Sequence, residues 1–404
     1  MNRRVVITGY GAVSPLGHTS AETWAGLAAG RSAIGPVVNQ PSEPLLIKIA
    51  GEVRGFDPLA HLDPKRLPLF DRFSQFALVA AKEAMAMSGF AVGEENSARV
   101  GVVVGSGAMG MSTIDEGYRR LFIEGNPRAH PLTVPRIMTS APCSQIAIEF
   151  GLHGPAFSTS SACASANHAI AQALGLIRQG QADVVLAGGT EAPLSFGAFK
   201  SWEALRVMAT DTCRPFSKDR RGMVLGEGAA MFMLETAEGA QRRGATIFAE
   251  LAGVGMSSDA GDIVLPDPAG AARAMSLALG DAGLNPEEID YVNAHGTGTP
   301  ANDRMETEAL RRVFGKHAHA LAISSSKSML GHSLGASGAL ELIAVVKAFE
   351  TGILAPTANF TEPDPECDLD YIPNKPRERR IGAAISNSFA FGGLNAVLAL
   401  RSFK

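Results

Sequence analysis

Apolar residues recur along the chain in two alternating patterns. Residues 77–89 (ALVAAKEAMAMSG) carry apolar side chains at a helical period, and residues 99–107 (RVGVVVGSG) then form a short apolar run bounded by turn residues. Residues 271–283 (AARAMSLALGDAG) and 291–298 (YVNAHGTG) repeat this order. The first pattern predicts an amphipathic helix and the second a buried strand, so each pair of segments predicts a helix followed by a strand.

The two parts of the chain also end alike. Residues 183–192 (DVVLAGGTEA) and 383–393 (AAISNSFAFGG) both read as strands that run into loops of small residues. Alternating strand and helix signals predict mostly parallel sheets covered by helices. We therefore expect two similar α/β halves, residues 1–245 and 246–404, although echoes of this kind also arise by chance in α/β chains.

Composition narrows the class of protein. The chain has 404 residues, 46% of them hydrophobic, which is enough for one large core or two medium ones. Only 19% of the residues are charged and 44 are glycine, a composition that argues against disorder. The net charge of -4 gives no broad basic field, so we do not expect nucleic acid as a partner.

The lack of a recognisable signal peptide or membrane span, together with the cysteine usage, predicts a cytoplasmic protein. No apolar run reaches the ~18–20 residues that span a bilayer. The start, MNRRVVITGYGAVSPLG, has two arginines before an apolar stretch, but VVITG is too short for a signal peptide and predicts a first buried strand. The cysteines are widely spread with no CxxC pair, which favours free thiols in a reducing compartment: Cys143, Cys163, Cys213 and Cys367.

Cys163 lies where a strand pattern gives way to a helix pattern. From Ala166 to Ile177 the apolar residues fall on one helical face, and the helix is expected to end near Gly180. At a helix N-terminus, free N–H groups and the macrodipole favour a thiolate, so the position predicts a lowered cysteine pKa. Small neighbours leave room for a substrate. The same residues also suit a buried, inert cysteine.

Two histidines lie in glycine-rich loops. His295 follows a predicted strand in YVNAHGTGTPAND, and His332 precedes a predicted helix in SSSKSMLGHSLGASGALE. Ligands bind at the carboxyl ends of strands in α/β sheets, where an imidazole can donate a hydrogen bond or act as a base. Lys327 is either a surface lysine or a fixed positive charge for this site. No HExxH motif or close pair brings His295 and His332 together on one helix, so we expect no metal.

The segment NSFAFGGLN, residues 387–395, places glycines at the end of a strand. Glycine permits positive φ and leaves backbone N–H groups free to face a ligand, which is the chemistry of an oxyanion hole. Phe391 fits either a core position or a movable cover.

Long motifs in a fixed order resemble those of the β-ketoacyl-[acyl carrier protein] synthase family. The resemblance covers essentially the whole chain and has the Cys-His-His pattern of the elongating branch. SANHAI, KSWEALRV and DTCRPFS are most similar to a rhizobial-type subgroup that includes nodulation ketosynthases. The matching motifs are RRVVITGYGAVSPLG, SSACASANHAI, RPFSKDRRGMVLGEGAA, YVNAHGTGTPAND, SSSKSMLGHSLGASGALE, CDLDYIP and NSFAFGG.

The resemblance implies a thiolase-like fold, in which two duplicated α/β halves form five layers, and a homodimer. It implies a 3-oxoacyl-[acyl carrier protein] synthase, in which Cys163 takes an acyl group from a carrier protein. Malonyl-carrier protein is then decarboxylated, and His295 and His332 stabilise the enolate that attacks the acyl group. The backbone N–H groups of Cys163 and Phe391 would hold the oxyanion. No cofactor is implied beyond the 4'-phosphopantetheine of the carrier.

The resemblance also assigns supporting roles. Lys327 and Glu341 would support the histidines, and Ala108 would line the acyl pocket, where a small side chain favours longer or unusual acyl chains unless Met109 refills the space. The other substrate-binding residues would be Thr297 and Thr299 on the pantetheine arm, with Phe389 and Gly392. Candidates for docking the acidic carrier are Lys65, Arg66, Arg128 and Arg206.

Some positions depart from the family pattern, and they leave alternatives open. Ala390 and Leu394 stand where the family commonly has glycine and threonine, and Asp262 lies near the place of a common histidine. A specialised ketosynthase for unusual or very long acyl chains, of the nodulation-factor or polyketide type, fits the same residues. A non-catalytic chain-length subunit would lack Cys163, and a coenzyme A-dependent thiolase would need a second cysteine near the C-terminus, where Cys367 lies in a polar CDLD segment.

Overall fold

The computed structural model describes residues 3–39 and 45–404. Within this part of the chain, ten strands form one continuous sheet in the order β10-β9-β13-β14-β8-β1-β7-β6-β4-β5, and β2–β3 and β11–β12 form two small sheets. The strands are β1 (Val5–Val13), β2 (Ile34–Pro36), β3 (Ile49–Gly51), β4 (Val100–Gly105), β5 (Ala156–Thr159), β6 (Val184–Glu191), β7 (Gly228–Thr236), β8 (Ala249–Ser258), β9 (Tyr291–Asn293), β10 (Ala322–Ser324), β11 (Ile353–Leu354), β12 (Arg377–Glu378), β13 (Ala383–Ala390) and β14 (Leu394–Arg401).

The strand order is mirrored about the contact between β1 and β8. On one side the sheet continues β7-β6-β4-β5, and on the other β14-β13-β9-β10, so strands from the two parts of the sequence occupy matching places. This arrangement agrees with the repeat seen in the sequence. The boundary at residues 245 and 246 stays a prediction.

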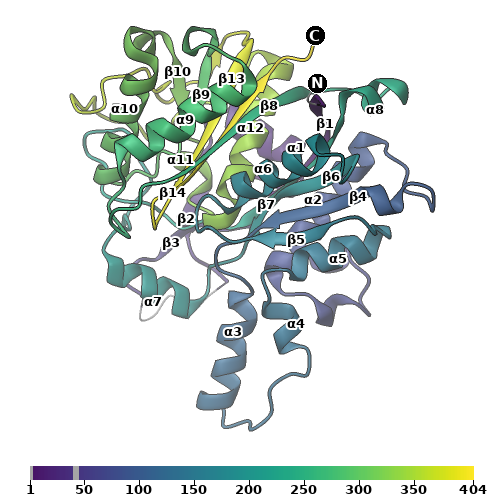
Figure 1. The fold of residues 1–404 in the computed structure, drawn as a ribbon. Helices are drawn as coiled ribbons and strands as arrows, with labels where there is room; N and C mark the ends of the chain where they lie inside the picture. The colour runs from purple at the N-terminus through teal and green to yellow at the C-terminus, as the bar shows by residue number, and fades with distance from the viewer. Residues whose placement is uncertain (1–2, 40–44) are drawn as a thin grey trace.

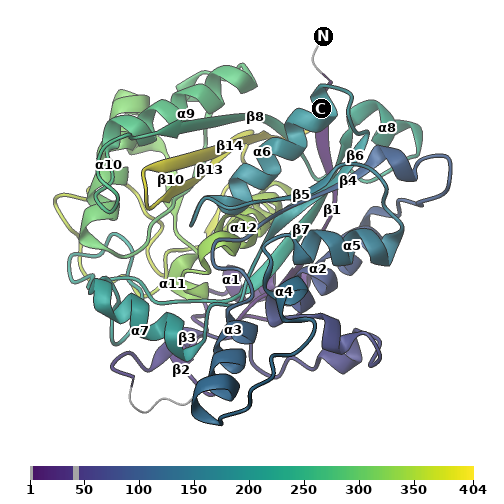
Figure 2. The same cartoon turned by 60° about the horizontal axis from the view of Figure 1, so that its bottom comes forward.

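The sheet consists of two half-sheets, one on each side of the contact between β1 and β8. Helices lie between the half-sheets and on both outer faces, which gives five layers in all (Figures 1 and 2). α2 and α5 cover the outer face of the first half-sheet, α9 and α10 cover the outer face of the second, and α6 and α12 lie between them. One apolar cluster lies under each outer helical layer, and a third surrounds the central helices. These helices are α2 (Arg72–Ser88), α5 (Ala141–Phe150), α6 (Ser165–Arg178), α9 (Pro268–Ala282), α10 (Pro300–Phe314) and α12 (Ser337–Thr351).

The remaining helices lie around this stack. α3 and α4 project from the body of the molecule as a hairpin (Figure 1). Among the described residues, no helix combines the length and apolar character needed to cross a membrane. The helices are α1 (Ser20–Ala28), α3 (Met111–Tyr118), α4 (Thr133–Ile137), α7 (Phe196–Leu205), α8 (Ala237–Arg242) and α11 (Lys327–Leu330).

The helices and strands predicted from periodicity are confirmed. Segments 77–89 and 271–283 lie in α2 and α9, and the strands predicted after them are β4 and β9. The predicted first strand is β1, and the helix after Cys163 is α6, which ends at Arg178.

The expectation of mostly parallel sheets was wrong. β4 pairs in parallel with β5 and β6, and β9 with β10 and β13, but the pairings of β1, β7, β8 and β14 are antiparallel. The cause is clear for β13 and β14, because the loop of residues 391–393 that joins them is too short for the crossover that parallel strands need.

Close backbone contacts hold the outer helices on the two central strands. A Cβ on Gly11 of β1 would lie 2.2 Å from the carbonyl oxygen of Ala80 in α2, and a Cβ on Gly255 of β8 would lie 2.0 Å from that of Ala274 in α9. Glycine at these places lets each helix approach its strand more closely than any side chain would allow.

We predict that Gly255→Ala lowers the free energy of unfolding by about 1–3 kcal/mol, because the added methyl group meets backbone and displaces α9. Gly280→Ala, in α9 itself, is the matched control, since a Cβ there meets nothing within 4 Å. Alanine at this exposed helical position is expected to raise the free energy of unfolding by about 0.5–1 kcal/mol. Urea unfolding of both variants measures the difference, and equal stabilities would contradict the packing argument.

Candidate functional site

Cys163, His295 and His332 come together in one cavity of about 210 Å³. Cys163 lies two residues before α6, His295 follows β9, and His332 lies in the loop between α11 and α12. The sulfur and one ring nitrogen of each histidine lie within 4.8 Å of one another, and Nε2 of His332 is 3.0 Å from Sγ of Cys163. The three residues singled out in the sequence therefore form one cluster.

The surroundings of His332 fix which nitrogen carries its proton. The backbone N–H of Leu334 donates to Nδ1 at 3.2 Å, and the hydroxyl of Ser337 lies 2.8 Å from the same atom. Because Nδ1 accepts hydrogen bonds, the neutral ring carries its proton on Nε2. His332 therefore donates a hydrogen bond to the sulfur of Cys163.

Lys327 does the same for His295. Its ammonium group donates to the backbone carbonyl of His295 at 2.6 Å and to Nδ1 of the ring at 3.3 Å, and it forms an ion pair with Glu341. Lys327 is 1% exposed, which excludes the surface-lysine interpretation. Nε2–H of His295 is therefore free to donate into the cavity. The ammonium group also opposes a metal cation at this cluster.

The predicted lowering of the Cys163 pKa was wrong. Burial raises the pKa of this thiol to about 12, although Lys327 and the backbone N–H groups of Cys163 and Phe391 act in the opposite direction. The helix terminus does favour the thiolate, but loss of hydration outweighs it because the site lies deep in the protein. Burial, together with Lys327, also holds the pKa values of His295 and His332 well below the usual range, so both rings are neutral.

Two buried carboxylates that sequence reasoning missed hold the loops of the site. Glu191 accepts hydrogen bonds from the N–H groups of Gly107 at 2.7 Å and Gly335 at 2.9 Å, which ties the loop after β4 to the loop of His332. Glu306 accepts from the N–H of His295 at 2.8 Å. Burial raises the pKa of each carboxyl to about 7. The only sequence signal was a glutamate that ends a buried strand and another in the helix after His295.

The loop of residues 391–393 covers one side of the cavity. The ring of Phe391 stacks on the indole of Trp202, with centroids 5.8 Å apart and an angle of 24° between the planes. Trp202, Phe389, Ala390 and Phe391 all line the cavity with Cys163. Gly392, by contrast, is exposed. Sequence analysis did not single out Trp202, because one tryptophan in a short amphipathic helix carries no distinguishing pattern.

Two further segments line the cavity. Thr297 and Thr299 belong to one, with their hydroxyl groups 2.8 Å apart, and Val264 and Leu265 belong to the other. Asp262 does not line the cavity. Its carboxylate accepts hydrogen bonds from the N–H groups of Val264 and Leu265, which lower the pKa of this carboxyl group. This aspartate therefore shapes the turn that forms the wall.

Ala108 packs beside the apolar cluster that surrounds Cys163, and its N–H donates to Glu191 at 3.1 Å. Neither Ala108 nor Met109 lines the cavity of Cys163, and Met109 is 39% exposed, with φ at 52°. The role predicted for Ala108 in an acyl pocket therefore stays a prediction. Cys367 packs in the outer cluster around α9 and α10, away from the cavity.

The four basic docking candidates are scattered over this chain. Arg206 is exposed and adjoins Val207, which lines the cavity. Arg66 forms an ion pair with Glu149 on α5, and Lys65 is exposed beside it. Arg128 lines a separate hollow between α3 and α4. Of these, Arg206 alone is next to a residue of the cavity wall.

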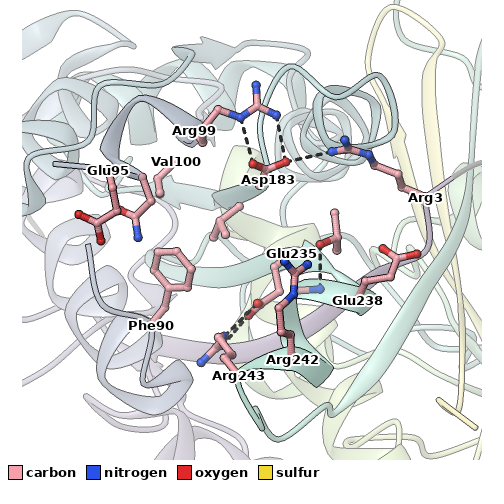
Figure 3. Close-up of a pocket in the computed structure, with 14 residues that line it drawn as sticks. Arg3, Phe90, Glu95, Arg99, Val100, Asp183, Glu235, Glu238, Arg242 and Arg243 are labelled. Atoms are coloured by element: carbon pink, nitrogen blue, oxygen red, sulfur yellow. Dashed lines mark hydrogen bonds and ion pairs between the residues drawn. The ribbon is translucent and has the colours of Figure 1, made fainter. Parts of the chain in front are cut away.

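A larger hollow of about 740 Å³ lies elsewhere, at the start of β4 and β6 (Figure 3). Its charges are largely satisfied within the chain, since Arg3 and Arg99 both pair with Asp183 at 2.9 Å and Arg243 pairs with Glu235 at 2.5 Å. Parallel strands bind ligands at their carboxyl ends, which here face Cys163. Although this hollow is larger than the cavity of Cys163, its position at the amino ends of the strands argues against it as the candidate site.

Comparison with known proteins tests these expectations. The family profile described as Beta-ketoacyl synthase, N-terminal domain matches residues 2–240, and that of the C-terminal domain matches residues 248–361. Nodulation protein E of Rhizobium sp. (strain N33) is 53% identical over 401 residues, covering 99% of this chain and 100% of the relative. 3-Oxoacyl-[acyl-carrier-protein] synthase 2 of Staphylococcus aureus (strain COL) is 40% identical over 410 residues, covering 100% and 99%.

A solved structure agrees over the full length. A ketosynthase in complex with its type II PKS acyl-carrier protein superimposes with a TM-score of 0.91 at 33% identity, covering 100% of both chains. The five layers described above are thus the thiolase-like fold, as the motifs predicted. With matches to both domain profiles and to full-length relatives, the chain belongs to the β-ketoacyl synthase family of condensing acyltransferases.

Proposed function

We propose that this protein is a 3-oxoacyl-[acyl carrier protein] synthase that extends an acyl chain by two carbons. The observation that carries this proposal is the cluster of Cys163, His295 and His332 in one cavity, with Nε2 of His332 3.0 Å from Sγ of Cys163. One nucleophile and two neutral hydrogen-bond donors are what a decarboxylative condensation needs.

In the first step, Sγ of Cys163 attacks the thioester carbonyl of an acyl-carrier protein. A new C–S bond forms, the bond to the pantetheine sulfur breaks, and the thiol proton leaves with the pantetheine thiol. The backbone N–H groups of Cys163 and Phe391 face the sulfur and stabilise the oxyanion.

In the second step, malonyl-carrier protein enters the same cavity. Its C–C bond to the carboxylate breaks, carbon dioxide leaves, and the electron pair becomes an enolate on the thioester. Nε2–H of His295 and of His332 donate to the enolate oxygen. The carbanion carbon then attacks the acyl-cysteine, a C–C bond forms, the C–S bond to Cys163 breaks, and the released thiolate takes a proton from solvent to restore the thiol. The product is a 3-oxoacyl chain on the carrier.

The partner in this reaction is an acyl carrier protein with 4'-phosphopantetheine. Thr297 and Thr299, which line the cavity, would bind the pantetheine arm. Arg206 is the docking candidate next to the cavity wall; Arg66, Arg128 and Lys65 stay candidates. We include a homodimer in the proposal because β5 is an edge strand with Phe157 36% exposed. Four buried free thiols suit work in the cytoplasm.

A second candidate is a ketosynthase specialised for unusual or very long acyl chains. Ala108 packs beside the apolar cluster that includes Cys163, and its small side chain would favour longer acyl chains there. Identity to nodulation protein E is also higher, at 53%, than the 40% to 3-oxoacyl-[acyl-carrier-protein] synthase 2. Substrate chain length separates the two candidates.

Incubation with a panel of acyl-carrier proteins of increasing chain length tests the proposal. We expect intact mass spectrometry to find one acyl group on the native protein and on Cys143→Ala, whose cysteine lies outside the cavity, and none on Cys163→Ala. Malonyl-carrier protein should then release carbon dioxide and extend the chain. Absence of malonyl-dependent extension would reject the condensing function, and an abrupt loss of loading beyond medium chains would reject the specialised alternative.

The raised pKa of Cys163 predicts a distinctive pH dependence of alkylation. The ordinary cysteine pKa is about 8.5, whereas that of Cys163 is raised to about 12. The thiolate is therefore a small fraction at neutral pH, and the rate of alkylation by iodoacetamide should rise about tenfold per pH unit between pH 7 and pH 10. Peptide mapping assigns the label to Cys163. A rate that levels off near pH 7 would instead show a thiolate–imidazolium pair with His332.

Replacing His295 should separate the two steps. His295→Ala removes one preorganised donor from the enolate, so carbon dioxide release from malonyl-carrier protein should fall by about 100–1000-fold. Acyl loading should change much less, because it is His332 that hydrogen-bonds Sγ of Cys163. His332→Ala is the comparison variant and should impair both steps. Radiolabelled malonyl release and loading assays measure them separately, and an equal loss in both from His295→Ala would contradict these roles.

A further inference from the structure

Trp202 is an aromatic side chain of the cavity wall to which the proposed reaction gives no role. Its indole stacks on the ring of Phe391, with centroids 5.8 Å apart, and both rings line the cavity of Cys163. Within the described residues, the indole N–H has no hydrogen-bond partner. The contact with Phe391 therefore rests on stacking and apolar packing.

The helix that carries Trp202 is fixed to its surroundings. The N–H of Gly197, in the first turn of α7, donates to Asp115 of α3 at 2.9 Å. Near the other end, a carboxylate oxygen of Glu203 accepts from the N–H groups of Leu46 at 2.7 Å and Ile47 at 2.9 Å. Because both ends of α7 are tied down, Trp202 is a fixed surface rather than a mobile side chain on a loose helix.

The other partner in the stack is followed by two glycines. Gly392 and Gly393 have φ values of 81° and 68°, which only glycine adopts readily, and we take them as the hinge of Phe391. Two backbone hydrogen bonds tie this hinge to residues 259–263: the N–H of Gly392 donates to the carbonyl of Ile263 at 2.8 Å, and the N–H of Asp259 donates to the carbonyl of Gly393 at 2.9 Å. The N–H of Phe391 faces the sulfur of Cys163, so displacement of the ring also disturbs that donor.

We infer that Trp202 is a positioning residue that holds Phe391 closed over Cys163 and so limits how fast long acyl chains enter the cavity. This inference rests on the proposed function. A fixed indole and a hinged phenyl ring form a latch, in which opening requires loss of one aromatic contact. Small reagents reach the sulfur without opening it, and long chains need the ring to move.

Two substitutions of similar size separate stacking from simple bulk. Trp202→Phe retains an aromatic ring, whereas Trp202→Leu retains apolar volume without one. We expect Trp202→Leu to raise the rate at which a long-chain N-alkylmaleimide labels Cys163 by about twofold to tenfold, the range that one aromatic pair contributes. Trp202→Phe should stay near the native rate, and iodoacetamide should label all three proteins at similar rates. Equal rates for the Phe and Leu variants would overturn the inference.

Fluorescence gives a second test in which Trp202 itself is unchanged. The chain has two tryptophans, so in Trp24→Phe, whose indole packs in the core away from the cavity, Trp202 is the sole emitter. Labelling of Cys163 with the long-chain maleimide should shift the emission of Trp202 to longer wavelength, because the ring of Phe391 no longer covers the indole. An unchanged spectrum after complete labelling would overturn the inference, even if the Leu variant does not fold.

These measurements do not depend on the condensing activity. If the protein fails to load acyl groups or to extend them from malonyl-carrier protein, the proposed function fails while the labelling rates still report on the latch. If the enzyme condenses normally and Trp202→Leu labels like the native protein, the latch fails alone.

Discussion

The buried ion pair of Lys327 and Glu341 is the interaction on which the rest of the site depends. Lys327 is 1% exposed, and its ammonium group reaches both the carbonyl and Nδ1 of His295. Burying an unpaired ammonium at this depth would cost much of its hydration free energy, and the ion pair with Glu341 offsets that cost. The ammonium group then fixes the proton of His295 on the nitrogen that faces the cavity and, together with burial, keeps the ring neutral.

The repeated architecture explains how residues far apart in sequence meet. The two central helices, α6 and α12, each come after an edge strand: α6 follows β5 directly, and α12 follows β10 with the short helix α11 between them. The loop before α6 holds Cys163 and the loop before α12 holds His332, so the two residues occupy matching places in the halves. Glu191 links the loop after β4 to the loop of His332, because it accepts hydrogen bonds from Gly107 in the first and Gly335 in the second.

Local pattern predicted most of the elements and the members of the cluster, because periodicity and glycine-rich loops leave a direct trace in the sequence. It failed where the answer depends on distant parts of the chain. The pKa of Cys163 follows from burial by both halves, and the antiparallel pairing of β14 follows from the short loop after β13. Glu191 and Trp202 carry no pattern of their own, since their roles arise from the loops and rings that the fold brings to them.

The raised pKa of the nucleophile has a physical rationale once the whole site is considered. The reacting groups in the resting cavity are neutral, a thiol and two imidazoles, and the ion pair of Lys327 and Glu341 lies behind them. A resting thiolate or imidazolium would be stabilised before any reaction, and that stabilisation would raise the barrier from the ground state. In the proposed reaction, the donors of Cys163, Phe391, His295 and His332 would face positions where negative charge develops during acyl transfer and decarboxylation. Their hydrogen bonds therefore strengthen in the transition state, which is the condition for catalysis.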